Sequence, residues 1–185
     1  AGHHDAARIA CDDARAELDP SDRMAAVRVA RRALQLQLLQ ARNPGDVVTE
    51  GRVLLEQARS IDEVEESILI LSSIADAHTR LSQRVDAELQ ARIATAEAER
   101  LQDVQLIADA RLRLGAALIE RAPHESLLEF SAARDRFLAR GNRYGVLRCD
   151  INSGNAHARR GEGDEARRAY EDAKRGAEEA NIPDL

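Results

Sequence analysis

The chain has 185 residues, 32% of them charged, and a formal net charge of −6. Acidic and basic residues are mixed throughout, so the chain lacks a basic stripe that could neutralise phosphates, and we expect no direct nucleic-acid binding. With two Tyr, two Phe and no Trp, the core must be filled by Ala, Leu, Ile and Val.

Pro, Gly and short polar breaks divide the chain into stretches rich in Ala, Leu, Arg, Glu and Gln, which are strong helix formers. Pro20 ends the first stretch, Asp22 offers an N-cap to the second, and Asp164 is expected to cap the last. The fold class is therefore all-α. The expected helices are 4–18, 21–42, 46–60, 63–82, 84–101, 103–121, 125–140, 142–160 and 164–180.

The two cysteines, Cys11 and Cys149, are far apart and form no CxxC motif. This spacing favours two buried free thiols in a reducing compartment over a disulfide framework or a zinc site. The longest apolar run, 68–71, is too short to cross a membrane, and no signal-peptide pattern opens the chain. We therefore expect a cytoplasmic protein with no membrane contact, no metal and no cofactor.

The segment 154–173 can be laid over the preceding chain at a period of about forty residues. Gly154 then falls opposite Gly115, and Tyr170 falls opposite Phe130. Repetition of this kind indicates a stacked array of helical hairpins. We expect one helical-repeat domain over 1–185, and the missing initial Met together with the unpaired first helix favours a fragment of a longer protein. The expected repeats are approximately 21–60, 61–101, 102–140 and 141–181.

The pattern resembles the tetratricopeptide repeat in its longer variety of about forty residues. That family carries a small residue in the first helix of each hairpin, and two small residues and an aromatic in the second. The last repeat matches with Gly154, Ala166, Tyr170 and Ala173, and the one before it with Gly115, Ser126, Phe130 and Ala133. The resemblance implies a right-handed α-α superhelix of about four hairpins preceded by one helix. Small residues let paired helices approach, and the aromatic fills the gap between successive hairpins.

One position of the repeat, normally large and apolar in that family, is polar in three hairpins. The residues at this position are Arg31, Arg111 and Asp150 in those three hairpins and Leu71 in the fourth. A charged side chain at a core position costs free energy unless it is paired or reaches solvent. We therefore expect these three side chains to form ion pairs or to extend to the surface.

No catalytic motif is present: the chain has no phosphate-binding glycine loop, no HExxH, no GxSxG and no cluster of Cys and His. We expect a protein that is not an enzyme. His78 and His157 fall where the repeat family has a packing residue. The acidic residues of 62–66 fall in the first turn of a helix, where the helix dipole favours solvated negative charge.

The resemblance implies a concave face lined by selected positions of each first helix. Arg and Asn suit a peptide ligand, since Asn pairs with both N–H and C=O groups and Arg binds a carboxylate through two hydrogen bonds. The candidate peptide-binding residues are Arg148, Asn152, Asn155, Arg159, Arg113, Asp76 and Arg80.

Two functions fit this reading. The first is a protein-interaction scaffold that binds a peptide or helix of a partner in the concave groove. The alternative is a sensor or regulatory segment of a multidomain bacterial signalling protein, attached to an ATPase, kinase, cyclase or transcriptional regulator. In both, the partner is a protein or peptide, and exposed apolar end helices also favour self-association.

Overall fold

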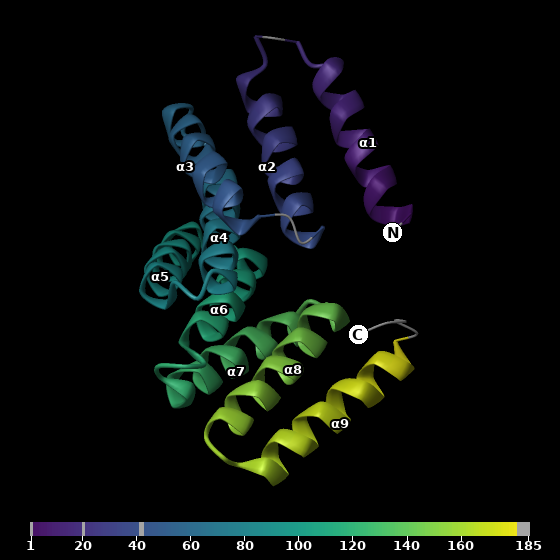
Figure 1. The fold of residues 1–185 in the computed structure, drawn as a ribbon, viewed down its shortest axis with the longest axis vertical. Helices are drawn as coiled ribbons and strands as arrows, with labels where there is room; N and C mark the ends of the chain where they lie inside the picture. The colour runs from purple at the N-terminus through teal and green to yellow at the C-terminus, as the bar shows by residue number, and fades with distance from the viewer. Residues whose placement is uncertain (1, 20, 41–42, 181–185) are drawn as a thin grey trace. The chain divides into compact units, whose positions relative to one another are not determined.

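The computed structural model describes residues 2–19, 21–40 and 43–180. All regular secondary structure in these ranges is α-helical (Figure 1), which confirms the all-α fold class. The chain divides into two compact units, 1–97 and 98–185. The organisation as one repeat domain stays a prediction.

Among the described residues, the first unit contains four helices and most of a fifth, and the second unit contains the other helices. The helices of the first unit are α1 (Gly2–Ala16), α2 (Arg23–Leu39), α3 (Pro44–Ser60), α4 (Val64–Arg80) and the greater part of α5 (Arg84–Leu101). Those of the second, after the end of α5, are α6 (Val104–Leu118), α7 (Pro123–Ala139), α8 (Arg143–Arg159) and α9 (Gly163–Glu179). Within the second unit each of these four helices packs against the next, and α6 also touches α8. In the first unit α1 to α4 pack in the same successive way, and α2 also touches α4.

The helix ends agree with the sequence expectation to within a few residues, apart from the expected end of the second helix at 42, which lies outside the described residues. Asp22 caps α2 as expected, accepting a hydrogen bond of 2.9 Å from the backbone N–H of Ala25. The expectation for Asp164 is wrong. Glu162 occupies the N-cap of α9 without a side-chain cap bond, and Asp164 lies in the first helical turn.

Several of the turns between helices contain a single residue with a positive φ angle. It is glycine in the last two, at Gly141 (φ 67°) and Gly161 (φ 77°), but Asp62, Ser82 and Gln102 adopt φ of 58–60° in the earlier ones. A residue in this conformation lets the chain turn back and bond to the last helical carbonyls, as the N–H of Asn142 does at 2.9 Å from the oxygen of Phe137.

Glycines lie where helices of the second unit come into close contact. A Cβ at Gly115 would lie 2.5 Å from the ring of Phe130, and one at Gly154 would lie closer still to the ring of Tyr170. The expected approach of small and aromatic residues is therefore confirmed within both hairpins. Phe130 is fully buried in a cluster that includes Cys149, so it also fills the space between successive hairpins, whereas Tyr170 is 39% exposed.

All three polar core residues form ion pairs, as expected. Arg31 Nε lies 2.9 Å from Glu66 Oε2, and Arg111 Nη1 lies 2.8 Å from Glu129 Oε2. Asp150 Oδ1 accepts a hydrogen bond of 2.6 Å from Arg134 Nε. The view of the 62–66 acidic residues as solvated is wrong for Glu66, which is buried beneath Arg31.

The two cysteines differ in environment. Cys149 is fully buried as expected, and burial raises the pKa of its thiol to about 12. Cys11 is half-buried on α1, so the expectation that it is buried is wrong. No helix of the described residues is long and apolar enough to cross a membrane.

Candidate functional site

One face of α8 carries a row of polar and aromatic side chains, which we call the α8 ridge. It consists of Tyr144, Arg148, Asn152, Asn155 and Arg159. At 3.6 residues per turn these positions fall within about 80° of one another around the helix axis. The ridge therefore brings together four of the residues that the sequence nominates for peptide binding.

The first part of the ridge is an aromatic and cationic surface. The guanidinium carbon of Arg148 lies 5.9 Å from the centroid of the Tyr144 ring, a geometry in which the ring face attracts the cation. Tyr144 is 53% exposed. Sequence reasoning did not nominate Tyr144, although its spacing of one helical turn from Arg148 is a signal that could have found it.

Local hydrogen bonds orient the two asparagines. Asn152 Nδ2 donates to the backbone oxygen of Arg148 at 2.8 Å. Asn155 is exposed, and its Oδ1 accepts a hydrogen bond of 2.8 Å from the hydroxyl of Tyr170 on α9. Each side chain is thereby held in a defined orientation on the helix.

The last part of the ridge is held by an exposed ion pair. Arg159 Nη2 lies 2.9 Å from Glu120 Oε2, with side-chain exposures of 54% and 34%. Exposed pairs contribute at most about 1 kcal/mol. This pair therefore holds the Arg159 side chain only weakly.

The remaining nominated residues lie elsewhere. Arg113 is half-buried on α6 of the same unit, and its Nη1 donates to the backbone oxygen of Asp109 at 3.1 Å. Arg80 and Asp76 lie on α4 of the first unit. Arg80 Nη1 donates to the backbone oxygen of Leu38 at 2.5 Å, so this side chain satisfies a carbonyl at the end of α2.

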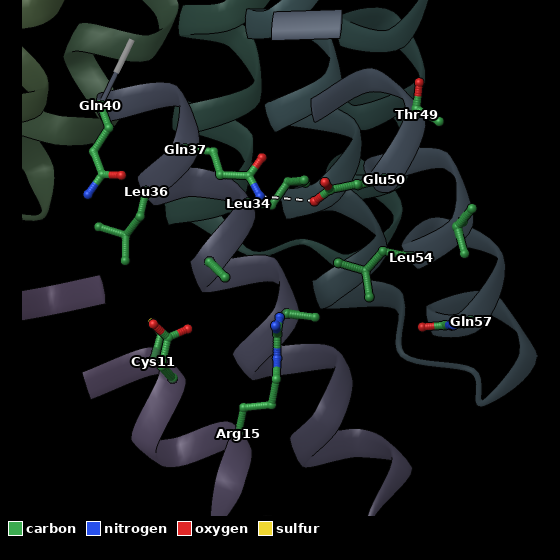
Figure 2. Close-up of a pocket in the computed structure, with 14 residues that line it drawn as sticks. Cys11, Arg15, Leu34, Leu36, Gln37, Gln40, Thr49, Glu50, Leu54 and Gln57 are labelled. Carbon is green, nitrogen blue, oxygen red and sulfur yellow. Dashed lines mark hydrogen bonds between the residues drawn. The ribbon is translucent and has the colours of Figure 1, made fainter. Parts of the chain in front are cut away.

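A pocket of about 570 Å³ opens between α1, α2 and α3 of the first unit (Figure 2). Leu34 and Leu54 contribute apolar surface to it, while Gln37 Nε2 on α2 donates to Glu50 Oε2 on α3 at 2.9 Å. Cys11 and Arg15 approach from α1. Sequence reasoning missed this pocket, because it forms only where three helices meet.

The two histidines at the ends of α4 and α8 are each held by a neighbouring side chain. The described residues contain no group of three or more His, Cys, Asp and Glu that could hold a metal ion. His78 is buried, and its Nδ1 lies 2.6 Å from Gln83 Oε1. His157 Nδ1 lies 2.7 Å from Glu162 Oε2, and this hydrogen bond lowers the pKa of the Glu162 carboxyl. Both histidines thus link a helix end to the turn that follows.

No family model matches the chain, and no curated protein matches it. Among solved structures it is similar to one described as BtubC (BKLC) from P. vanneervenii, with a TM-score of 0.67 and 18% sequence identity. The similarity covers 96% of this chain and 73% of that chain. At this identity, it shows that the two share a helical fold.

Proposed function

We propose that the chain is a protein-interaction module, and that the α8 ridge binds a peptide segment or helix of a partner protein. The observation that carries the proposal is the ridge itself. An exposed Tyr, two Arg and two Asn share one helix face, and Tyr and Arg are the residue types that dominate binding energy at protein interfaces.

The proposed architecture is a right-handed superhelix of the tetratricopeptide type. Its support is the recurrence of one contact: glycine of a first helix beneath an aromatic of the second, at Gly115 with Phe130 and at Gly154 with Tyr170. A hairpin repeated with the same contact places its first helices on one side of the stack. In this architecture the α8 ridge lies on the concave face.

The dimensions of the ridge suit a short ligand. Arg148 and Arg159 are separated by about 16 Å along the helix axis, at 1.5 Å per residue. An extended peptide covers that length with about five residues. Asn152 and Asn155 supply amide groups for its backbone, and Arg159 supplies a bidentate partner for an acidic side chain. The proposed ligand is thus an extended segment with a carboxylate near one end.

The proposal is tested by selecting binders from a displayed library of random peptides and measuring their affinities. Replacing Asn152 and Arg159 together by Ala should weaken the selected peptides at least about tenfold, because two polar anchors are lost. Ala is compatible with the helix, so the fold is retained. Replacing the exposed Arg168 by Ala is the control, and it should leave affinity unchanged.

The outcome that overturns the proposal is equal affinity of the double variant and the control for every selected peptide. Selected sequences should also contain Asp or Glu near one end. Replacing that residue by Asn or Gln should weaken binding to the unmodified protein, and should have little effect on binding to the Arg159→Ala variant.

A further inference from the structure

The pocket between α1, α2 and α3 lies where the later hairpins are closed. Two positions of α2, Ala30 and Gln37, line it and are partly exposed. At a period of about forty residues, the same two positions of the other first helices are buried, with exposures of at most 3%. They are Ile70, Ala110 and Cys149 for Ala30, and Ala77, Ala117 and Ala156 for Gln37. The packing that closes α4, α6 and α8 at these positions therefore leaves α2 open.

The place of this hairpin near one end of the chain does not account for the opening. The last three described helices are α7, α8 and α9, and Cys149 and Ala156 of α8 are nevertheless buried. The pocket is built by three successive helices of the first unit. Gln37 also stands where the other first helices have Ala, so the chain places a carboxamide where close packing needs a small apolar residue.

The pocket combines an apolar wall with polar groups at its edge. Leu34 and Leu54 are buried residues of the wall, whereas Glu50 and Gln57 of α3 are exposed. The wall is completed by Ala30, Ala33, Leu36 and Val53. A hollow of about 570 Å³ with mainly apolar walls and a few polar groups is typical of a small-molecule binding site.

The pocket carries one positive and one negative side chain that are not paired with an opposite charge. Arg15 reaches into it from α1 (Figure 2), and among the residues that the structure describes its side chain forms no hydrogen bond or ion pair. Glu50 of α3 accepts a hydrogen bond of 2.9 Å from the neutral amide of Gln37. Asp12, the third charged residue of the lining, already interacts with another residue. A ligand that carries both charges therefore complements the pocket better than a ligand with one.

We propose that this pocket binds a small zwitterion with an aliphatic body, the chemistry shared by a free aliphatic amino acid and a short aliphatic peptide. The carboxylate of the ligand binds the Arg15 guanidinium, which can hold it through two hydrogen bonds. The ammonium group binds the Glu50 carboxylate, and the aliphatic side chain lies against Leu34 and Leu54. This site is separate from the α8 ridge and does not depend on the function proposed for it.

The test is isothermal titration calorimetry of the protein with two probes, leucine and the dipeptide Leu-Leu. At least one of them should bind saturably. Acetylating its amino group and amidating its carboxyl group should each weaken binding at least about tenfold, because each change removes a charge that the pocket pairs. Tighter binding of the dipeptide would identify a peptide as the ligand, and tighter binding of leucine would identify a free amino acid.

Protein variants locate the two charges of the ligand. Arg15→Gln should weaken the zwitterion about tenfold and leave the affinity for its amidated form unchanged. Glu50→Gln should weaken the zwitterion similarly and leave the affinity for the acetylated form unchanged. Arg52→Gln is the matched control, because Arg52 is an exposed residue of α3 outside the pocket lining. Ala33→Leu puts a larger side chain into the pocket and should weaken every form of the ligand.

Three results would overturn the proposal. The first is the absence of saturable binding by both probes up to their solubility limits. The second is equal affinity for the zwitterion and for its acetylated and amidated forms. The third is an affinity for the zwitterion that Arg15→Gln, Glu50→Gln and Ala33→Leu all leave unchanged, which would place binding outside the pocket. Circular dichroism of the two charge variants should match that of the unmodified protein, because both side chains are exposed.

Discussion

Arg31 on α2 and Glu66 on α4 form an ion pair inside the first unit, with Nε 2.9 Å from Oε2 and side-chain exposures of 14% and 8%. Nε of Arg28 lies 3.6 Å from Oε1, the other carboxylate oxygen of Glu66. Glu66 is thus a buried carboxylate that depends on its partners. The pair joins two helices that are not adjacent in sequence.

Replacing Arg31 by Leu should lower the free energy of unfolding by about 3 kcal/mol, because a buried carboxylate then loses its closest cation. Replacing both Arg31 and Glu66 by Leu should bring stability back to within about 1 kcal/mol of the unmodified protein, since no buried charge remains. Urea unfolding measures both values. If Arg31→Leu lowered the free energy of unfolding by no more than the roughly 1 kcal/mol expected for an exposed ion pair, this account would be contradicted.

Replacing Gly115 by Ala should destabilise the second unit by up to about 2 kcal/mol. The new Cβ would lie 2.5 Å from the fully buried Phe130 ring, and the overpacking cost of about 1–3 kcal/mol exceeds the helix-propensity gain of about 1 kcal/mol. A Cβ added at Gly163 would have no heavy atom within 4 Å, so Gly163→Ala is the matched control. Thermal unfolding measures the midpoint temperature of both variants. An equal midpoint for Gly115→Ala and Gly163→Ala would refute the close contact between Gly115 and Phe130.

Replacing Gln102 by Gly should stabilise the protein by about 0.5–1 kcal/mol, because φ of 58° costs a residue with a Cβ more than it costs glycine. Gln102 is exposed, so no packing is lost. Gln102→Ala keeps the backbone penalty and serves as the control. Chemical denaturation should rank the Gly variant above the Ala variant, and the reverse order would show that this turn is not strained.

The Glu162 carboxyl should titrate below its ordinary pKa of 4.5, first because His157 hydrogen-bonds to it and then because Arg160 does. Because the pKa of Glu162 is lower in the folded state, its carboxylate stabilises the fold fully above about pH 4.5. This stabilisation is lost as the pH falls through the pKa that Glu162 has in the folded protein. Carbon-13 NMR of the carboxylates measures the pKa directly. His157→Ala should raise it, and an unchanged value in that variant would show that His157 is not the cause.

Much of the secondary structure could be predicted from local signals, whereas the partners of particular side chains could not. Pro and Gly mark the helix ends in the sequence, because their effect on φ and on backbone hydrogen bonding does not depend on distant residues. The pattern showed that Arg31 and Arg111 needed partners, but the partners come from other helices whose register is set by packing. Cys11 was expected to be buried, yet it lines the pocket between α1, α2 and α3.

For the candidate site, too, the helix face could be predicted from the sequence, whereas the contacts of its side chains could not. Helical spacing alone places Arg148, Asn152, Asn155 and Arg159 on one face of α8. The contacts that orient them, such as the hydrogen bond from Tyr170 to Asn155, depend on how α9 packs against α8. Self-association through end helices stays a prediction.

The most direct test of the central claim is a nitrogen-15 NMR titration of the protein with the tightest peptide from the library selection. The side-chain amide signals of Asn152 and Asn155 and the Nε–H signals of Arg148 and Arg159 should shift together, with one dissociation constant. If these signals stay fixed while those of Gln37 and Gln57 in the pocket of the first unit shift instead, the α8 ridge is not the peptide-binding surface.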